Sequence, residues 1–215
     1  RPVLAVDVAL LRLHAGQLQV LVVRRRESPH AGRDALPGVA LRADESLADA
    51  AQRALAEKCA LAAAAGRDLH LEQLAVFDGL RRDPRGRAVS VAYLGLLRGE
   101  AALAKAARWP AAASLRGLAF DHDAIVALAV KRLRGKLRYS DIAAHLVADT
   151  FRSDELRAAY EAILGRSLNR SNFRTKLTRI GLIEQIGIDD ERGGAGRPAH
   201  RYRFRRWSGE RRDFL

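Results

Sequence analysis

The chain has 215 residues, of which 48% are hydrophobic and 29% are charged, a balance typical of a folded protein rather than a disordered one. Its longest apolar runs are much shorter than a membrane-spanning helix, so we expect no membrane association. The only cysteine, Cys59, excludes an internal disulfide and favours a reducing, cytoplasmic location.

The formal charge of +13 comes from 38 Lys and Arg against 25 Asp and Glu, and it is unevenly distributed. Residues 151–215 carry a net charge of +6, whereas the much longer segment 1–150 carries +7. This asymmetry predicts a polyanionic partner near the C-terminal end. An arginine-rich base composition of the gene is the alternative explanation, and charge alone does not separate the two.

The N-terminal part of the chain predicts a mixed α/β domain, because strand-like runs alternate with two helical patterns. The expected elements are strands over residues 3–13 and 18–24, a loop over 31–38, a helix from Ser46, strands over 69–77 and 88–97, and a helix over 124–134. Ser46 and Asp49 have the spacing of a capping box, which fixes the start of the first helix. We place this domain at residues 1–138.

From about residue 139 the pattern changes to short helices followed by a basic hairpin. The expected elements are helices over residues 140–147, 153–164 and 171–180, then strands over 182–188 and 200–205 joined by a Gly-rich turn. In the last strand Tyr202 and Phe204 alternate with arginines, so one face packs while the other presents guanidinium groups. This order is typical of a winged helix-turn-helix, and we assign residues 139–215 to such a domain.

The third of these helices is the expected recognition helix. Arginine and asparagine read the edges of guanine and adenine, whereas lysine and the arginines of a wing contact phosphates or the minor groove. The predicted base-reading residues are Arg170, Asn172 and Arg174, and the other predicted DNA contacts are Lys176, Arg179, Arg197, Arg201 and Arg203. A solvated basic helix face and a plain glycine turn around Arg197 are the alternatives.

Other kinds of site find no support in the residue pattern. The six histidines are scattered without metal-ligand spacing and Cys59 has no cysteine partner, so we predict no metal site and no cofactor. The sequence also lacks the Gly-Lys-Ser/Thr end of a phosphate-binding loop and the Gly-x-Ser-x-Gly elbow of a serine hydrolase.

Residues 36–61 resemble a Nudix box, a loop–helix–loop motif whose glutamates hold Mg²⁺ on a diphosphate. Glu45, Arg53 and Glu57 match the motif. The departures are Val39 and Ala60 in place of glycines, and Ala54 and Lys58 in place of glutamates. Because Mg²⁺ needs several hard oxygen ligands and Lys58 adds a positive charge, we predict a Nudix fold without catalytic residues. The alternative role of Arg53 and Glu57 is a helix-stabilising i,i+4 pair.

Further segments extend the resemblance to nearly the whole chain. They are residues 82–87, 89–93, 119–122, 132–137, 160–166 and 196–199. Together with the box, they make the chain similar to the Nudix-related transcriptional regulators of NAD metabolism. The resemblance implies a mixed-sheet α/β/α sandwich with a C-terminal winged helix, and a homodimeric repressor that ADP-ribose or a related nucleotide releases from its DNA operator. The chain departs from that family's pattern at Asp34, where a Trp is usual, and at Val39.

An ADP-ribose-like effector would bring two phosphates and an adenine to the N-terminal domain. Arginines near residues 24–26 and 82–87 would neutralise the phosphates, and Tyr93 or Phe77 would stack on the base. The predicted effector-binding residues are Arg26, Glu45, Arg53, Glu57, Arg82, Arg85, Arg87 and Tyr93. The alternatives are a solvated turn over 82–87 and a core position for Tyr93.

The sequence therefore favours a cytoplasmic, nucleoid-associated repressor of NAD-related or sugar-metabolism genes, in which effector and DNA oppose each other through linkage. One alternative is a weakly active Nudix hydrolase of nucleoside diphosphate derivatives, because Glu45 and Glu57 of the motif are still present. A second, weaker rival is a protein-interaction module built on the same fold.

Overall fold

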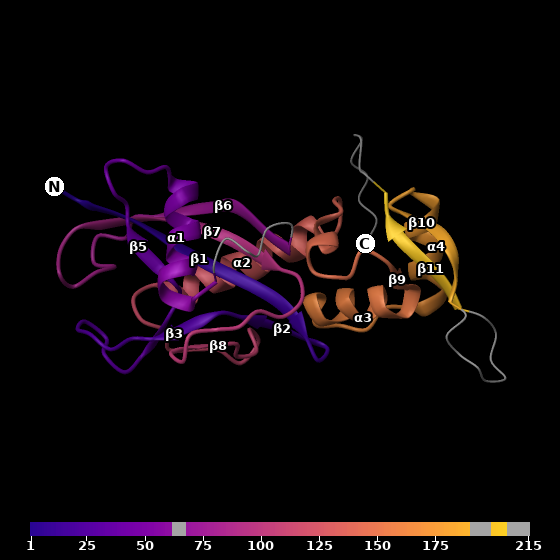
Figure 1. Ribbon diagram of the computed structural model, residues 1–215, viewed down its shortest axis with the longest axis horizontal. Helices are drawn as coiled ribbons and strands as arrows, with labels where there is room; N and C mark the ends of the chain where they lie inside the picture. Colours follow the sequence, from indigo (N-terminus) through magenta and orange to yellow (C-terminus); the bar gives the residue numbers. More distant parts are fainter. Residues whose placement is uncertain (62–67, 190–198, 206–215) are drawn as a thin grey trace.

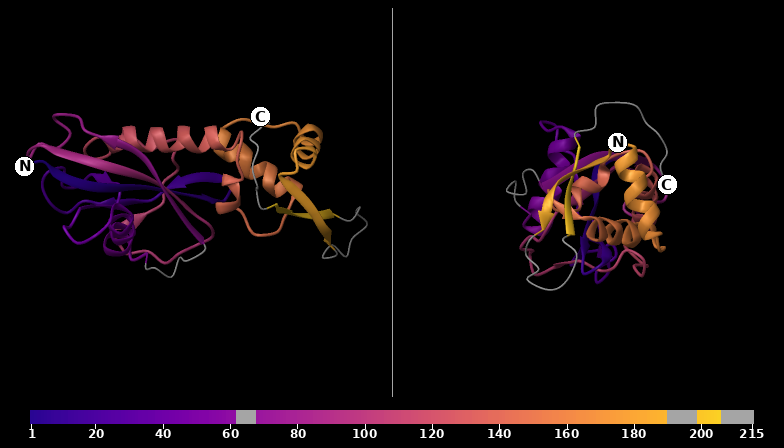
Figure 2. Two further views of the ribbon diagram at one scale, coloured as in Figure 1. Left: turned by 90° about the horizontal axis from the view of Figure 1, so that it is seen from above. Right: turned by 90° about the vertical axis from the view of Figure 1, so that its right-hand side faces the viewer.

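The computed structural model describes residues 1–61, 68–189 and 199–205. The molecule is elongated, with a sheet-based part at its N-terminal end and a smaller helical part with its own short sheet at the other (Figures 1 and 2). No helix within these residues is long and apolar enough to cross a membrane. Arg197, a predicted DNA contact, lies outside the described residues.

The N-terminal part is built on a mixed five-stranded sheet. Its strands are β1 (Val3–His14), β2 (Gln17–Val20), β5 (Gly38–Ala40), β6 (Leu69–Phe77) and β7 (Ala88–Leu97). The order is β2-β1-β7-β6, with β5 paired to β1. β1 and β7 run parallel from Val3↔Ala88 to Arg12↔Leu97, and the other pairs are antiparallel. A smaller sheet consists of β3 (Val22–Arg24), β4 (Asp34–Ala35) and β8 (Ala107–Arg108) in the order β4-β3-β8.

Side-chain alternation along β1 gives the large sheet two cores. Val6, Val8 and Leu10 belong to the core that contains the buried face of helix α1 (Leu47–Cys59). Ala9 and Leu11 belong to the core that contains helix α2 (His122–Lys136). The result is an α/β/α sandwich, which confirms the fold expected for this part of the chain.

The C-terminal part packs three helical segments against a three-stranded sheet. These elements are η2 (Ile142–His145), α3 (Ser153–Leu164), α4 (Arg170–Arg179), β9 (Phe151–Arg152), β10 (Ile183–Asp189) and β11 (Ala199–Phe204). The sheet order is β10-β11-β9. Tyr160 of α3 meets Phe173 of α4 edge-on, with ring centroids 5.1 Å apart, and Tyr202 of β11 is buried with them. This arrangement is the expected winged helix.

Most element predictions hold, and the exceptions have physical reasons. The strands at 69–77 and 88–97 and the capping box between Ser46 and Asp49 are confirmed. The single strand expected over 18–24 is wrong, because the chain passes at Leu21 from the large sheet to the small one. The helix expected over 140–147 is only the short 3₁₀ helix η2. The loop expected over 31–38 includes the short strand β4.

Candidate functional sites

The glutamate that opens the box, Glu45, is engaged by arginine. Arg53 on α1 donates from Nε to Glu45 Oε2 at 2.8 Å and from Nη2 to Glu45 Oε1 at 2.5 Å. The same Nη2 donates to the Ala40 carbonyl at 2.9 Å, and the Arg42 backbone N–H donates to Glu45 Oε1 at 2.8 Å. These bonds, led by the one from Arg53, lower the pKa of Glu45 to about 2. Glu45 is therefore an ionised carboxylate that is already satisfied by protein donors.

The second glutamate of the box lies in the same network of charges. Glu57 is one turn after Arg53, whose Nη1 is 3.4 Å from Glu57 Oε1, and Arg42 Nη2 is 3.3 Å from that oxygen. Glu57 is more open to solvent, with 42% of its side chain exposed. The Arg53 guanidinium thus contacts both carboxylates and that of Arg42 contacts Glu57 alone, and the i,i+4 pair considered from the sequence is present.

These residues do not fit a magnesium ion. The motif's other glutamate positions are Ala54, which is buried, and Lys58, which is exposed next to Glu57. Both remaining carboxylates face arginines, and Mg²⁺ requires oxygen ligands that are free to coordinate in a near-octahedral arrangement. Among the described residues no group of three His, Cys, Asp or Glu side chains is placed to hold a metal ion. We therefore assign no chemical step to a metal here.

A second charged cluster is buried below the 82–87 loop. Arg82 donates to both oxygens of Asp121, at 2.9 and 2.8 Å, and to Asp7 Oδ2 at 3.3 Å. Ser90 Oγ donates to Asp7 Oδ2 at 2.6 Å. Only 5% of the Arg82 side chain is exposed, and its hydrogen bond to Asp121 helps raise its pKa against the opposing effect of burial. The predicted phosphate ligand Arg82 is thus held inside the protein.

His122 completes this cluster. The Leu36 backbone N–H donates to its Nδ1 at 2.8 Å, so the ring proton lies on Nε2, which faces Asp7 Oδ1 at 3.6 Å. Burial lowers the pKa of His122. Close approach also explains Gly38, because a Cβ there would lie 2.0 Å from Asp7 Oδ1. Of this cluster, Arg82 was predicted as an effector ligand from the sequence, whereas Asp7, Ser90 and His122 were given no individual role.

Another predicted effector arginine, Arg85, lies with Arg25 beside Phe120, the residue before Asp121 of this cluster. The Arg85 and Arg25 guanidinium groups lie 5.8 and 4.8 Å from the centroid of the Phe120 ring. Arg85 also forms an ion pair with Asp83 at 2.7 Å, and Arg87 donates to the Asp78 carbonyl at 2.6 Å. The predicted ligand Arg26 is exposed nearby in the chain. The structure thus groups Arg82, which is bonded to Asp121, and Arg85 near Phe120.

Tyr93, the predicted stacking residue, lies in the core between the sheet and α1. It is 5% exposed, and its hydroxyl accepts a hydrogen bond from Gln73 Nε2 at 3.4 Å. This is the core position considered as its alternative. Stacking by Tyr93 stays a prediction, and an exposed ring face for it is not seen.

Helix α4 presents the expected polar face. Asn169 caps it by accepting the Asn172 N–H at 3.0 Å, and Phe173 and Leu177 are buried. The predicted contacts on this helix are all exposed: Arg170, Asn172, Arg174, Lys176 and Arg179. No ion pair to these four basic side chains occurs among the described residues. Their positive charge is therefore available to a polyanion.

The two described arginines predicted on the wing have protein partners. Arg203 donates from Nε to Glu184 Oε1 at 2.6 Å, and this bond lowers the pKa of Glu184. Arg201 is half-buried and its Nη1 lies 3.4 Å from Thr150 Oγ1. The burial of Tyr202 between them confirms the alternating pattern of β11. Among the predicted contacts, α4 therefore carries the freer charges.

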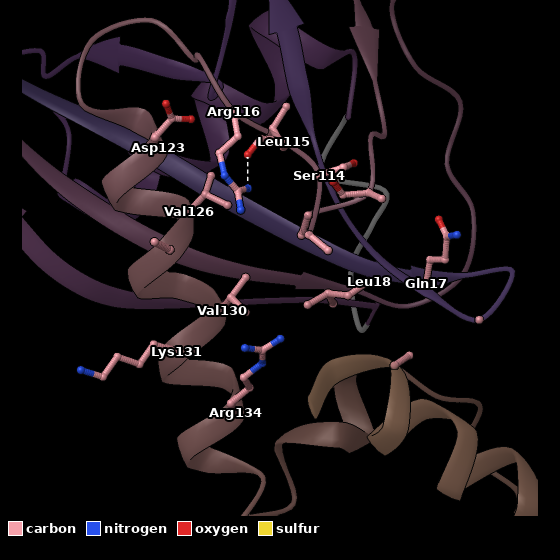
Figure 3. A pocket seen from close by; sticks show the side chains of 16 residues that line it. Gln17, Leu18, Ser114, Leu115, Arg116, Asp123, Val126, Val130, Lys131 and Arg134 are labelled. Carbon is pink, nitrogen blue, oxygen red and sulfur yellow. Dashed lines mark hydrogen bonds between the residues drawn. The ribbon is translucent and has the colours of Figure 1, made fainter. Parts of the chain in front are cut away.

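An open cleft lies elsewhere, at the joint between the two parts of the molecule. It has a volume of about 960 Å³ and lies between the turn at residues 16–18, the segment 111–116 and one face of α2, with Ala162 of α3 at its edge (Figure 3). No predicted effector residue lines it.

Comparison with known proteins agrees with this two-part architecture. A family model of the NUDIX domain matches residues 2–130, and one of the NrtR DNA-binding winged helix domain matches residues 143–204. The chain is 34% identical over 212 residues to the ADPR responsive transcriptional repressor NtrR of Acinetobacter baylyi, covering 94% of this chain and 82% of that protein. The chain belongs to the NrtR family.

Solved structures extend this family assignment to three dimensions. Shewanella oneidensis NrtR complexed with a 27mer DNA has 31% identity and a TM-score of 0.78, over 94% of this chain and 93% of that one. The NUDIX domain of the same protein complexed with ADP ribose has 34% identity and a TM-score of 0.54, over 62% and 89%. A MutT/nudix family protein from Enterococcus faecalis has 27% identity and a TM-score of 0.79, over 95% and 87%.

Proposed function

We propose that this NrtR family chain is a transcriptional repressor that binds operator DNA through α4 and releases it when its NUDIX domain binds ADP-ribose. The observation that carries the proposal is the face of α4, where exposed basic side chains and Asn172 surround a helix fixed from behind by Phe173 and Leu177. Arginine and asparagine in this position read base edges. The DNA and ADP-ribose complexes of the Shewanella oneidensis relative support both halves of the proposal.

The effector site belongs, in this proposal, to the surface that carries Arg25, Arg26, Arg85 and Phe120. Guanidinium groups beside an aromatic ring match the phosphates and base of a nucleotide. Glu45, Arg53 and Glu57 would border it as a charge-paired scaffold. Arg87 and Tyr93 remain predicted contacts. Arg82 lies beneath this surface and positions Asp121 through hydrogen bonds.

The NUDIX domain senses rather than cleaves in this proposal. Its two box carboxylates are paired with Arg42 and Arg53, and the motif's other two glutamate positions are Ala54 and Lys58, which offer no ligand for Mg²⁺. A homodimer, with its two winged helices about one helical turn or a multiple of it apart, would read a palindromic operator. The domain limits 1–138 and 139–215 remain our proposed boundary. A repressor of this kind works in the cytoplasm, at the nucleoid.

The test is a titration of the full chain onto DNA from upstream of its own gene and neighbouring genes, with scrambled DNA as the control. We expect tight, sequence-selective binding that weakens steeply as salt rises, and loss of binding when ADP-ribose is added. Equal, weak binding to both DNAs would refute the repressor. Metal-dependent release of AMP from ADP-ribose would instead favour the hydrolase.

A matched pair of variants separates specific from general electrostatic binding. Arg174→Gln removes one positive charge from the exposed face of α4, and Lys105→Gln removes one from an exposed position in the N-terminal part. We expect only Arg174→Gln to reduce the preference for operator over scrambled DNA. Equal losses in both variants would mean that net charge, and not the α4 face, determines binding.

A further inference from the structure

The buried cluster around His122 joins the loop that opens the box to the first turn of α2. We infer that α2 couples the effector surface to the winged helix, and that His122 is the residue that positions it. The inference rests on the proposed function and adds the route by which effector and DNA oppose each other.

At its N-terminal end, α2 is hydrogen-bonded to the loop before β5. The Leu36 N–H donates to His122 Nδ1 at 2.8 Å, and the Ala119 N–H donates to the Asp34 carbonyl at 2.8 Å. The Leu36 N–H and the Asp34 carbonyl are thus bonded to His122, the first residue of α2, and to Ala119, three residues before it. Arg82 holds the adjoining Asp121 with two more bonds.

The 36–38 loop is packed too tightly against Asp7 and His122 to move independently of α2. Asp7 and His122 are 6% and 3% exposed, and Gly38 approaches Asp7 so closely that a Cβ would overlap its carboxylate. Close-packed groups of this kind transmit displacement rather than absorb it. An effector that displaces Arg82 or Arg85 in the 82–87 loop should therefore displace the start of α2. The same holds for an effector that displaces the 36–38 loop.

The helix itself then acts as a rigid connection. Its 15 residues span about 22 Å at the usual rise of 1.5 Å per residue. Ile125, Ala129 and Leu133 are fully buried against the sheet, so the helix slides or tilts as one body. Displacement at His122 is carried to its last turn.

At its C-terminal end, α2 is bonded to the winged helix. Arg134 donates from Nε to the Ile163 carbonyl in the last turn of α3 at 2.7 Å. Tyr160, one turn earlier on α3, packs edge-on against Phe173 of α4. The cleft is open between α2 and Ala162 of α3, which leaves room there for α3 to follow a displacement of α2 (Figure 3).

The test is the coupling factor between effector and DNA in the full chain. It is the ratio of the operator Kd with saturating ADP-ribose to the Kd without it, measured by fluorescence anisotropy. His122→Asn keeps an oxygen near the position of Nδ1 and retains the Leu36 bond, whereas His122→Gln places its amide near Nε2 and loses that bond. We expect His122→Asn to keep the wild-type factor within about twofold and His122→Gln to lose at least about fivefold.

Two further variants separate coupling from stability. Ser90→Ala removes a bond to Asp7 within the same cluster but leaves Leu36 and α2 joined, so its melting temperature falls while its coupling factor stays. Arg134→Met breaks the bond at the other end of α2 from an exposed position, and its coupling factor falls while its ADP-ribose affinity, measured by calorimetry, stays.

The outcomes distinguish this inference from the proposed function. A wild-type chain with no coupling between ADP-ribose and operator DNA would overturn both. A coupled wild type with unchanged factors in His122→Gln and Arg134→Met would overturn the inference alone, as would an equal loss in Ser90→Ala. If His122→Gln does not fold, Arg134→Met decides the question.

Discussion

Around α1 and the 82–87 loop, arginines lie against carboxylates, whereas along α4 they extend from the surface without ion-pair partners among the described residues. Arg53 and Arg82 each engage two acidic side chains. Arg170 and Arg174 share a solvent-facing side of a helix whose other side is buried. The same residue type therefore serves internal structure in one part of the molecule and an external polyanion in the other, and only the neighbouring carboxylates distinguish the two uses.

The largest effect should come from breaking an internal pair. Arg82→Met leaves Asp7 and Asp121 without their shared cation in a buried cluster, and removing one partner of such a cluster costs about 3–5 kcal/mol of unfolding free energy. Urea unfolding measures this loss. Arg81→Met, at the adjacent exposed position, is the matched control and should change stability by less than about 0.5 kcal/mol. Equal stability of the two variants would show that the Arg82 cluster contributes nothing.

Removing an arginine that has no acidic partner should instead reduce DNA affinity and leave stability nearly unchanged. Arg174→Ala should weaken operator binding by about 1–3 kcal/mol, as the loss of a base contact does, and leave the urea midpoint near that of the wild type. Anisotropy titration against operator and scrambled DNA measures the effect. A stability loss as large as that of Arg82→Met, with unchanged DNA affinity, would place Arg174 among the internal arginines and would break the comparison.

Acidification should destabilise the protein through the buried His122 and the half-buried His145. Burial lowers the pKa of His122, and burial together with the adjacent His70 lowers that of His145. In the unfolded chain both imidazoles bind protons near pH 6.5, whereas in the native state they stay neutral to lower pH. Stability is therefore retained above that pH and falls as the pH drops below it.

Urea midpoints at pH 7.5 and 5.5 check this expectation. The wild type should have the lower midpoint at pH 5.5, and His122→Asn should show a smaller difference between the two values, because the buried imidazole is gone. A midpoint that rises on acidification, or an identical difference in the variant, would contradict the assigned protonation state of His122.

Local patterns in the sequence predicted the elements, but not the contacts between distant segments. The alternation of β11 and the apolar spacing of α4 repeat every few residues. The burial of Tyr202 and Phe173 could therefore be predicted from the sequence alone. The i,i+4 spacing likewise predicted the Arg53–Glu57 pair. Periodicity records which face of an element is buried.

The cluster around Asp7 has no such local signature. Its members come from β1, the 82–87 loop, β7 and the start of α2, and Ser90 lies 83 residues from Asp7. Their meeting depends on the parallel pairing of β1 with β7, which places Ala5 opposite Ser90 and brings that strand alongside Asp7. Which charged residues satisfy one another across a sheet is fixed by register, and a single sequence does not specify register between strands so far apart.

The smallest expected effect is the response to magnesium. Because Arg53 and Arg42 already satisfy Glu45 and Glu57, addition of Mg²⁺ should leave the thermal midpoint where sodium chloride of equal ionic strength leaves it. A site filled at ten times its Kd would instead add about 1.4 kcal/mol to the unfolding free energy. A magnesium-specific rise in the thermal midpoint that Glu57→Gln abolishes, accompanied by release of AMP from ADP-ribose, would mean that Glu45 and Glu57 leave their arginine partners and bind the metal. The internal pairs of the box would then be a resting state of a hydrolase, and the contrast with α4 would hold for structure but not for function.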